Sequence, residues 1–275
     1  MGIAVLGSGT MGRGIAVRCA RHGHEVVLYN RQRHAGTERQ LEREMRIAQK
    51  LSPVTGTPAP IALTDDLGAI AGCSLVIESI AEDLDAKCAL LRQVSTRVHG
   101  EALVATNTSS LPLDRLAGSV EHGARFVAMH FFNPAWQIDT VEVAPAPGTS
   151  ASTLEAAHDF VRSVGGQAVR APGQAGYIVN RALFLLIAES LRLESQGISP
   201  VDIDSSLKAT VGMRMGPLEL ADFIGLDVCD SILRSLRDAT GSAAYEVGDA
   251  LSRRVGRGTL GRKSGAGIHS YGGRS

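Results

Sequence analysis

The sequence predicts an α/β fold of the doubly wound type, followed by an all-helical region. Short apolar runs of strand type alternate with helix-like stretches as far as Arg170, the order typical of a parallel sheet with helices on both faces. A glycine-rich segment joins the first strand-type run directly to the first helix-like stretch, and no convincing strand-type run follows Tyr177. We place the boundary near Pro172, which predicts domains of residues 1–172 and 173–275.

Composition excludes several classes of protein. The 275 residues carry 28 basic and 28 acidic side chains, so the formal net charge is zero and nothing points to nucleic acid or an anionic membrane. The four cysteines are scattered, with no CxxC pair and no histidine cluster at metal-ligand spacing. The apolar N-terminus is interrupted by glycines and lacks a basic leader, and no apolar run is long enough to span a bilayer. We expect a soluble cytoplasmic protein with reduced thiols and no metal.

A glycine-rich loop follows the first predicted strand, residues 3–6. A helix-like stretch (13–21) and a second strand (24–29) come next, and this context makes the GxGxxG pattern a specific one. The first glycine permits a tight turn, the second lets a diphosphate approach the backbone, and the third lets the helix pack on the strand. The sequence therefore predicts a Rossmann-type dinucleotide site, whose loop residues are Gly7, Gly9, Thr10, Met11 and Gly12.

The residue after the second strand bears on the choice of dinucleotide. An acidic residue usually binds the adenosine ribose diol at this place, but the chain has Asn30, followed by Arg31 and, nearby, Arg33. A missing carboxylate removes repulsion toward a 2′-phosphate, and a guanidinium can bind that group. We predict that NADP is accepted and slightly favoured. Alternatively, Asn30 binds the diol of NAD and the arginines are solvated.

The next elements continue the alternation. A charged helix with a narrow apolar stripe is expected at 37–50, a Pro-containing connector at 52–60, a strand at 75–78, a helix opened by 81–87, and a strand at 103–106. The last strand ends in Asn107-Thr108-Ser109-Ser110, and polar side chains at the carboxyl ends of parallel strands gather over the cofactor crevice. Ser109 can be a site hydroxyl or a helix N-cap.

His130 ends an apolar strand-type run that begins at Arg125, and Asn133-Pro134 then turns the chain. Glu142 lies between two valines with the alternation of a second strand, so its carboxylate can face back toward His130. A carboxylate on one ring nitrogen fixes the tautomer and stabilises the imidazolium, which makes a general base for an alcohol proton. The alternative is a buried histidine held by a core carboxylate.

The remaining elements are a helix at 153–164, a short strand at 167–170 and a long, largely buried helix at 179–189. The broad apolar surface of that last helix, in a small helical domain, predicts a partner surface and a homodimer.

These motifs resemble those of a known family. The chain is similar to the L-3-hydroxyacyl-CoA dehydrogenases over nearly its full length, in the order GSGTMGRGIA, VIESIAEDLDAK, NTSSL, MHFFNP, VEV, YIVNR, GPLELADFIGLD and GRKSGAGIHSY. The resemblance implies a dinucleotide-binding domain followed by a helical dimerisation domain.

The resemblance also implies roles for individual residues. His130 matches the catalytic base, Glu142 its partner, and Ser109 and Asn180 the residues that hold the substrate. Cofactor-side positions are matched by Glu82, Lys87, Asn107 and Asn133, and by Lys263 from the helical domain. The implied reaction interconverts 3-hydroxyacyl and 3-ketoacyl thioesters, for example 3-hydroxybutyryl-CoA, by hydride transfer to NAD or NADP.

The chain departs from the family pattern in three places. Asn30 replaces an aspartate, which bears on the specificity for NAD. The other two suggest a different handle on the substrate: the helical hairpin after the second strand is short and Pro-rich, and Asp139 replaces a lysine. An acidic residue there weakens the attraction of a phosphate-rich handle. One alternative is therefore a short polar acyl group on an acyl carrier protein, as in relatives that act in polyketide extender-unit synthesis. Two others are a β-hydroxyacid dehydrogenase on a free acid and a non-catalytic, crystallin-like protein.

Overall fold

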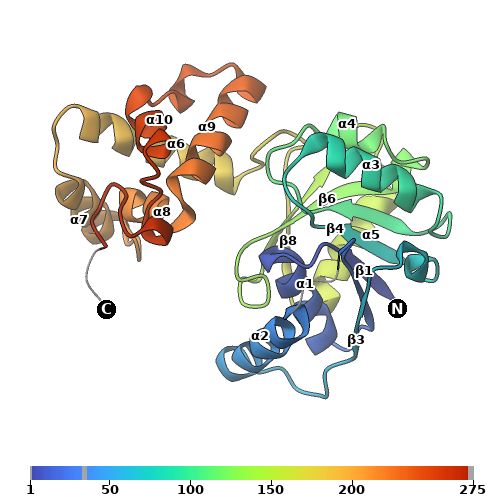
Figure 1. Ribbon diagram of the computed structural model, residues 1–275. Coiled ribbons are helices and arrows are strands. Elements are labelled where there is room, and N and C mark those ends of the chain that lie inside the picture. Colours follow the sequence, from blue (N-terminus) through green and yellow to red (C-terminus); the bar gives the residue numbers. More distant parts are fainter. Residues whose placement is uncertain (1, 33–35, 272–275) are drawn as a thin grey trace. The chain divides into compact units, whose positions relative to one another are not determined.

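The computed structural model describes residues 2–32 and 36–271. It divides into two compact units, residues 1–177 and 178–275, and each is described by itself (Figure 1).

The first unit is built on one eight-stranded sheet of order β3-β2-β1-β4-β5-β6-β7-β8. Six strands are mutually parallel, whereas β7 runs antiparallel to β6, and β8 is parallel to β7. The carboxyl ends of β1, β4, β5 and β6 therefore meet at one edge, which is where ligands bind to such sheets. The strands are β1 (Ile3–Leu6), β2 (Val26–Tyr29), β3 (Ile61–Thr64), β4 (Leu75–Glu78), β5 (Leu103–Thr106), β6 (Phe126–Phe131), β7 (Thr140–Pro145) and β8 (Gln167–Arg170).

Helices cover both faces of this sheet, as Figure 1 shows. The alternation of side chains along β1 sends Ile3 and Val5 to one core and Ala4 and Leu6 to the other. The predicted doubly wound fold is confirmed. One core is closed by α1 (Thr10–Arg21), α2 (Thr37–Leu51) and α5 (Ala151–Ser163); the other by η1 (Leu67–Ile70), α3 (Leu84–Ser95) and α4 (Leu113–Ala117). A short turn of helix, η2 (Gly123–Arg125), precedes β6.

Three expectations for this unit are corrected. Strand β3 was not predicted, because it is a half-buried, four-residue edge strand whose apolar pattern is too short to recognise. Helix α1 begins at Thr10 rather than Arg13, so the last part of the glycine loop is already helical. Strand β6 continues past His130 to Phe131, because Phe131 still pairs with Val141 of β7.

The second unit is helical, as predicted, apart from two isolated bridges that link Ala266 to Gly261 and to Ser270. Its core includes Phe184, Leu218 and Leu233. The elements are α6 (Val179–Ser195), α7 (Pro200–Val211), α8 (Pro217–Ile224), α9 (Leu226–Thr240), η3 (Ala243–Tyr245), α10 (Asp249–Gly256) and η4 (Arg262–Ser264).

Helix α6 differs from its prediction. It runs to Ser195, and within its unit only one side is buried: Leu185 remains 39% exposed, while Phe184 and Ile187 lie in the core. The expectation of a largely buried helix is thus wrong, because only five of its 17 residues are buried in the chain. None of the helices in the described ranges is long and apolar enough to cross a membrane.

Candidate active site

The glycine loop after β1 is shaped for a diphosphate. Gly7 has φ +110°, and a Cβ at Gly12 would overlap the Gly7 carbonyl oxygen, so the turn and the helix approach each other without side chains. A Cβ at Gly9, in contrast, would have no described atom within 4 Å. Gly9 is also the N-cap of α1 and has no side chain to satisfy the first helical N–H groups. Open space and donors aimed at it fit the diphosphate of a dinucleotide.

An arginine braces this loop. Arg13 donates from Nη1 to the Ser8 carbonyl oxygen (2.7 Å) and from Nε to Glu44 Oε1 (2.9 Å). Since Glu44 lies on α2, the loop is tied to the helix that follows β2.

Buried charges stabilise the strand ends beside the loop. Glu78 ends β4 and is fully buried; it accepts hydrogen bonds from Lys87 Nζ (2.7 Å), Thr106 Oγ1 (2.6 Å) and the Ile80 N–H (2.7 Å). Lys87 itself is 1% exposed, and its Nζ lies 3.5 Å from Glu82 Oε2. The structure thus places Lys87 beneath the site, in a buried ion pair. A direct cofactor contact stays a prediction for it.

Glu82 organises the loop after β5. Its carboxylate accepts hydrogen bonds from the Thr108 hydroxyl, the Ser109 N–H (3.1 Å) and the Ser110 hydroxyl (3.0 Å). Ser109 is half-buried, and its carbonyl oxygen accepts from the Gly176 N–H (2.8 Å). Because the N-cap of the next helix is Pro112, the N-cap alternative for Ser109 is wrong. Its hydroxyl is left as a candidate substrate ligand.

Asn107 links three neighbouring strands at this edge. Its Oδ1 accepts from the Phe131 N–H (2.9 Å), and its Nδ2 donates to Ser79 Oγ (3.3 Å). The amide therefore joins the ends of β4, β5 and β6, and it holds the backbone next to His130.

His130 and Glu142 form the pair that the sequence predicted. They face each other across β6 and β7 in the strand register, and His130 Nδ1 lies 2.8 Å from Glu142 Oε2. His130 is 7% exposed and Glu142 1% exposed. A carboxylate can only accept, so the neutral ring carries its proton on Nδ1 and presents a lone pair at Nε2.

Tyr177 is a site component that the sequence reading missed. It adopts φ 45°, its ring centroid lies 5.6 Å from that of His130, and its hydroxyl donates to the Thr108 carbonyl oxygen (2.9 Å). Burial raises the pKa of the Tyr177 phenol, and Glu82 and Glu142 add to that effect. The phenol thus stays neutral and keeps donating to the loop. Its place at the head of the YIVNR motif was the available signal.

The remaining predicted residues lie on other elements. Asn30 donates from Nδ2 to the Gln32 carbonyl oxygen (2.7 Å), and Arg31 is exposed. Arg33 lies outside the described residues. Asn133 is exposed on the turn after β6. In the helical unit Asn180 is half-buried on α6, and Lys263 donates to Asp227 Oδ1 (2.5 Å); their part in the site stays a prediction.

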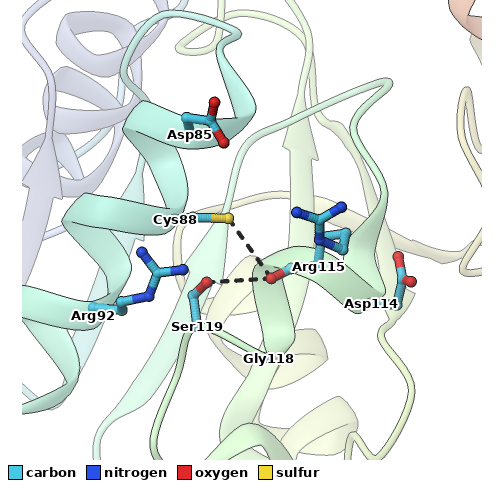
Figure 2. A pocket seen from close by; sticks show the side chains of 7 residues that line it. All are labelled: Asp85, Cys88, Arg92, Asp114, Arg115, Gly118 and Ser119. Atoms are coloured by element: carbon cyan, nitrogen blue, oxygen red, sulfur yellow. Dashed lines mark hydrogen bonds between the residues drawn. The ribbon is translucent and has the colours of Figure 1, made fainter.

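A separate hollow of about 290 Å³ lies between α3 and α4. Figure 2 shows the side chains that line it. One lining residue is Cys88, whose thiol donates weakly to the Arg115 carbonyl oxygen (3.7 Å). None of the lining residues was predicted for the active site. The hollow is therefore not part of the proposed centre.

Family models match both units. The model for the 3-hydroxyacyl-CoA dehydrogenase NAD binding domain matches residues 2–174, and that for the C-terminal domain of the same family matches residues 176–271. The chain belongs to the 3-hydroxyacyl-CoA dehydrogenase family. The predicted family, enzyme class and NAD-binding domain are confirmed, whereas the preference for NADP stays a prediction.

Individual relatives agree with that assignment. A probable 3-hydroxybutyryl-CoA dehydrogenase of Deinococcus radiodurans is 33% identical over 98% of this chain and 100% of that protein. The mitochondrial hydroxyacyl-coenzyme A dehydrogenase of Sus scrofa is 33% identical over 98% of this chain and 90% of its own length. The crystal structure of (S)-3-hydroxybutyryl-CoA dehydrogenase from Ralstonia eutropha has a TM-score of 0.92, with 29% identity over 99% of both chains.

The glycine loop yields a paired prediction. Gly9→Ala should lower the melting temperature only slightly, by the poorer N-capping of alanine, because its Cβ meets no described atom. It should weaken dinucleotide binding by at least about tenfold by occupying the space for the diphosphate. Gly12→Ala should lower both the melting temperature and the affinity for the dinucleotide, because its Cβ overlaps the Gly7 carbonyl oxygen. Calorimetric titration with NADH and thermal melts measure the two effects. Unaltered NADH affinity in Gly9→Ala would place the diphosphate elsewhere.

Proposed function

We propose that this protein interconverts 3-hydroxyacyl-CoA and 3-ketoacyl-CoA, with a short substrate such as 3-hydroxybutyryl-CoA, and uses NAD(H). The observation that carries the proposal is the buried pair of His130 and Glu142, at the edge of the sheet where the glycine loop lies. The names of the relatives supply the substrate class: 3-hydroxybutyryl-CoA dehydrogenases match over nearly the whole chain.

His130 is the general base in this proposal. With Nδ1 held by Glu142, the ring takes the proton of the substrate hydroxyl at Nε2, and the carboxylate stabilises the imidazolium that results. The nicotinamide of the bound dinucleotide supplies the acceptor for the C3 hydride. Ser109 and Asn180 orient the hydroxyl and the thioester carbonyl, and orientation provides much of the acceleration.

The cofactor side uses two kinds of residue. Gly7, Gly9 and Gly12, with Thr10 and Met11 at the start of α1, surround the diphosphate. Glu82, Lys87 and Asn107 shape the wall formed by the ends of β4 and β5, through the contacts given above. Asn133 and Lys263 complete the cofactor-side set in this proposal.

Replacing the base tests the proposal directly. His130→Gln should lower kcat by at least about 100-fold and leave the dissociation constant of NADH nearly unchanged, because only proton transfer is lost. Steady-state oxidation of 3-hydroxybutyryl-CoA and NADH titration measure the two quantities. Equal losses of turnover and NADH binding would make His130 a structural residue. Absence of turnover in the unaltered protein would favour the non-catalytic alternative.

For the cofactor, we propose that NADP is also accepted and is slightly favoured. No carboxylate stands directly after β2, and the Asn30 amide donates within its own loop instead. Arg31 is exposed beside it and can pair with a 2′-phosphate.

Parallel titrations with NADH and NADPH test this choice. NADPH should bind at least as tightly as NADH. Arg31→Ala should weaken the binding of NADPH by about tenfold and leave the binding of NADH unchanged, because only NADPH carries the 2′-phosphate. Cofactor fluorescence reports both. Binding of NADH that is tighter than that of NADPH and unaffected by Arg31→Ala would indicate ordinary specificity for NAD.

A carrier-protein thioester is the second substrate candidate. Its support is the region after β2. Among the residues described there, α2 is the single helix, and the connector from it to β3 holds no other. The argument from Asp139 is weaker than the sequence suggested, because Arg18 pairs with that carboxylate at 3.2 Å. Comparing kcat/KM for the same acyl group on CoA and on a carrier protein decides between the two substrates. A clear preference for the CoA thioester excludes the carrier protein.

We further propose a homodimer in a reducing, cytoplasmic compartment. All four cysteines are free and buried. Exposed large apolar side chains concentrate in the helical unit, and a second copy would cover them. In the described part of that unit these are Ile178, Leu185, Ile198, Val201, Val211, Phe223 and Val228. Light scattering distinguishes a dimer from the 28.9 kDa monomer.

A further inference from the structure

We infer that Arg18, on α1, is a positioning residue for the catalytic pair. It holds the turn between β6 and β7, residues 132–139, and so holds the two strands that carry His130 and Glu142. The inference rests on the proposed role of His130 as the base.

Arg18 is a cation in the interior, 1% exposed. Its Nε donates to the Val164 carbonyl oxygen (2.9 Å), and its Nη1 donates to the carbonyl oxygens of Ala135 (2.9 Å) and Ile138 (2.7 Å). Its Nη2 reaches Asp139 Oδ1 at 3.2 Å, although that carboxylate is 72% exposed. Three of the four partners are thus backbone carbonyls from segments far away in the sequence, and two of those lie in the turn.

The same side of α1 carries further contacts with the turn. A Cβ at Gly14 would lie 3.2 Å from Ala135 Cβ, so the turn packs directly on the helix backbone. Arg21 donates from Nη1 to the Trp136 carbonyl oxygen at 3.5 Å, the longest of these contacts. Positions 14, 18 and 21 are four and three residues apart and share one helical face. Arg18, in the middle, makes the strongest connections.

The turn matters because the catalytic pair lies next to it. In the pairing of β6 with β7, the pair nearest the turn is Phe131 with Val141, and the next is His130 with Glu142. A displaced turn therefore moves these two pairs directly, and a misplacement of about 1 Å can cost about 100-fold in rate. The N-terminal end of α1, a helix about 18 Å long, borders the proposed diphosphate site. One rigid element therefore positions both the cofactor loop and the turn beside the base.

Arg21 provides a matched control. It is the same residue type on the same helix, 3% exposed, but it donates to the Ser52 carbonyl oxygen at the end of α2, and its one contact with the turn, to the Trp136 carbonyl oxygen, is 3.5 Å long. Loss of Arg21 therefore removes a buried guanidinium without releasing the carbonyls that Arg18 holds.

The experiment compares Arg18→Met, Arg18→Lys and Arg21→Met in oxidation of 3-hydroxybutyryl-CoA. Arg18→Met should lower kcat by about 30-fold with less than about threefold change in the KM for NAD, because orientation and not binding is lost. With 3-deuterated substrate, the isotope effect on kcat should rise, since a slowed chemical step becomes rate-limiting. Arg18→Lys should recover part of kcat, because an ammonium can still donate to one or two of the carbonyls. Arg21→Met should melt lower but keep kcat within about threefold.

Equal behaviour of the two methionine variants, with kcat retained and only the melting temperature lowered, would overturn the inference and make Arg18 purely structural. If Arg18→Met does not fold, the kcat and isotope effect of Arg18→Lys decide the question in the same way. His130→Gln, run in parallel, separates this failure from that of the proposed function. If His130→Gln retains kcat, the base assignment itself is wrong, whatever Arg18 does.

Discussion

The pairing of His130 with Glu142 is the interaction on which the rest of the first unit depends. The two residues are joined twice, by the antiparallel register of β6 and β7 and by a side-chain hydrogen bond of 2.8 Å. A buried carboxylate without a partner is costly, so the pair is stable only while the register holds. The run of mutually parallel strands from β3 ends at β6, and the reversal at β7 is what brings Glu142 opposite His130.

A layer of buried polar contacts lies under the site and sets the positions of its loops. Glu78 and Lys87 form an ion pair that is almost completely buried, and breaking such a pair by removing one partner costs about 3–5 kcal/mol. Glu82, in the segment between β4 and α3, accepts hydrogen bonds from the loop after β5. Because these carboxylates bind backbone and hydroxyl groups, the loops are oriented independently of a ligand, which is the preorganisation that catalysis by orientation requires.

The helical unit uses carboxylates in a similar way. Asp204 accepts from the N–H groups of Leu218 and Glu219 at the start of α8, and from His269 Nε2 (2.8 Å). Asp222, fully buried, accepts from the Ile268 N–H (2.9 Å) and the Tyr271 hydroxyl (3.0 Å). The chain near its end therefore adds hydrogen bonds where a unit of this size has a limited apolar core.

What the sequence determined by itself was local. The glycine loop, most strands, the helices of the first 170 residues apart from α4, and the alternation that turns Glu142 toward His130 follow from short-range patterns, because each depends on the backbone preferences or periodicity of neighbouring residues. The edge strand β3 was not predicted, because its four half-exposed residues are too few to show a recognisable apolar pattern. Only the tertiary structure decided that Arg18 reaches Val164 and the turn at Ala135, and that the Tyr177 hydroxyl reaches the Thr108 carbonyl. Those partners lie 146, 117 and 69 residues apart, and no local pattern encodes which buried donor meets which distant carbonyl.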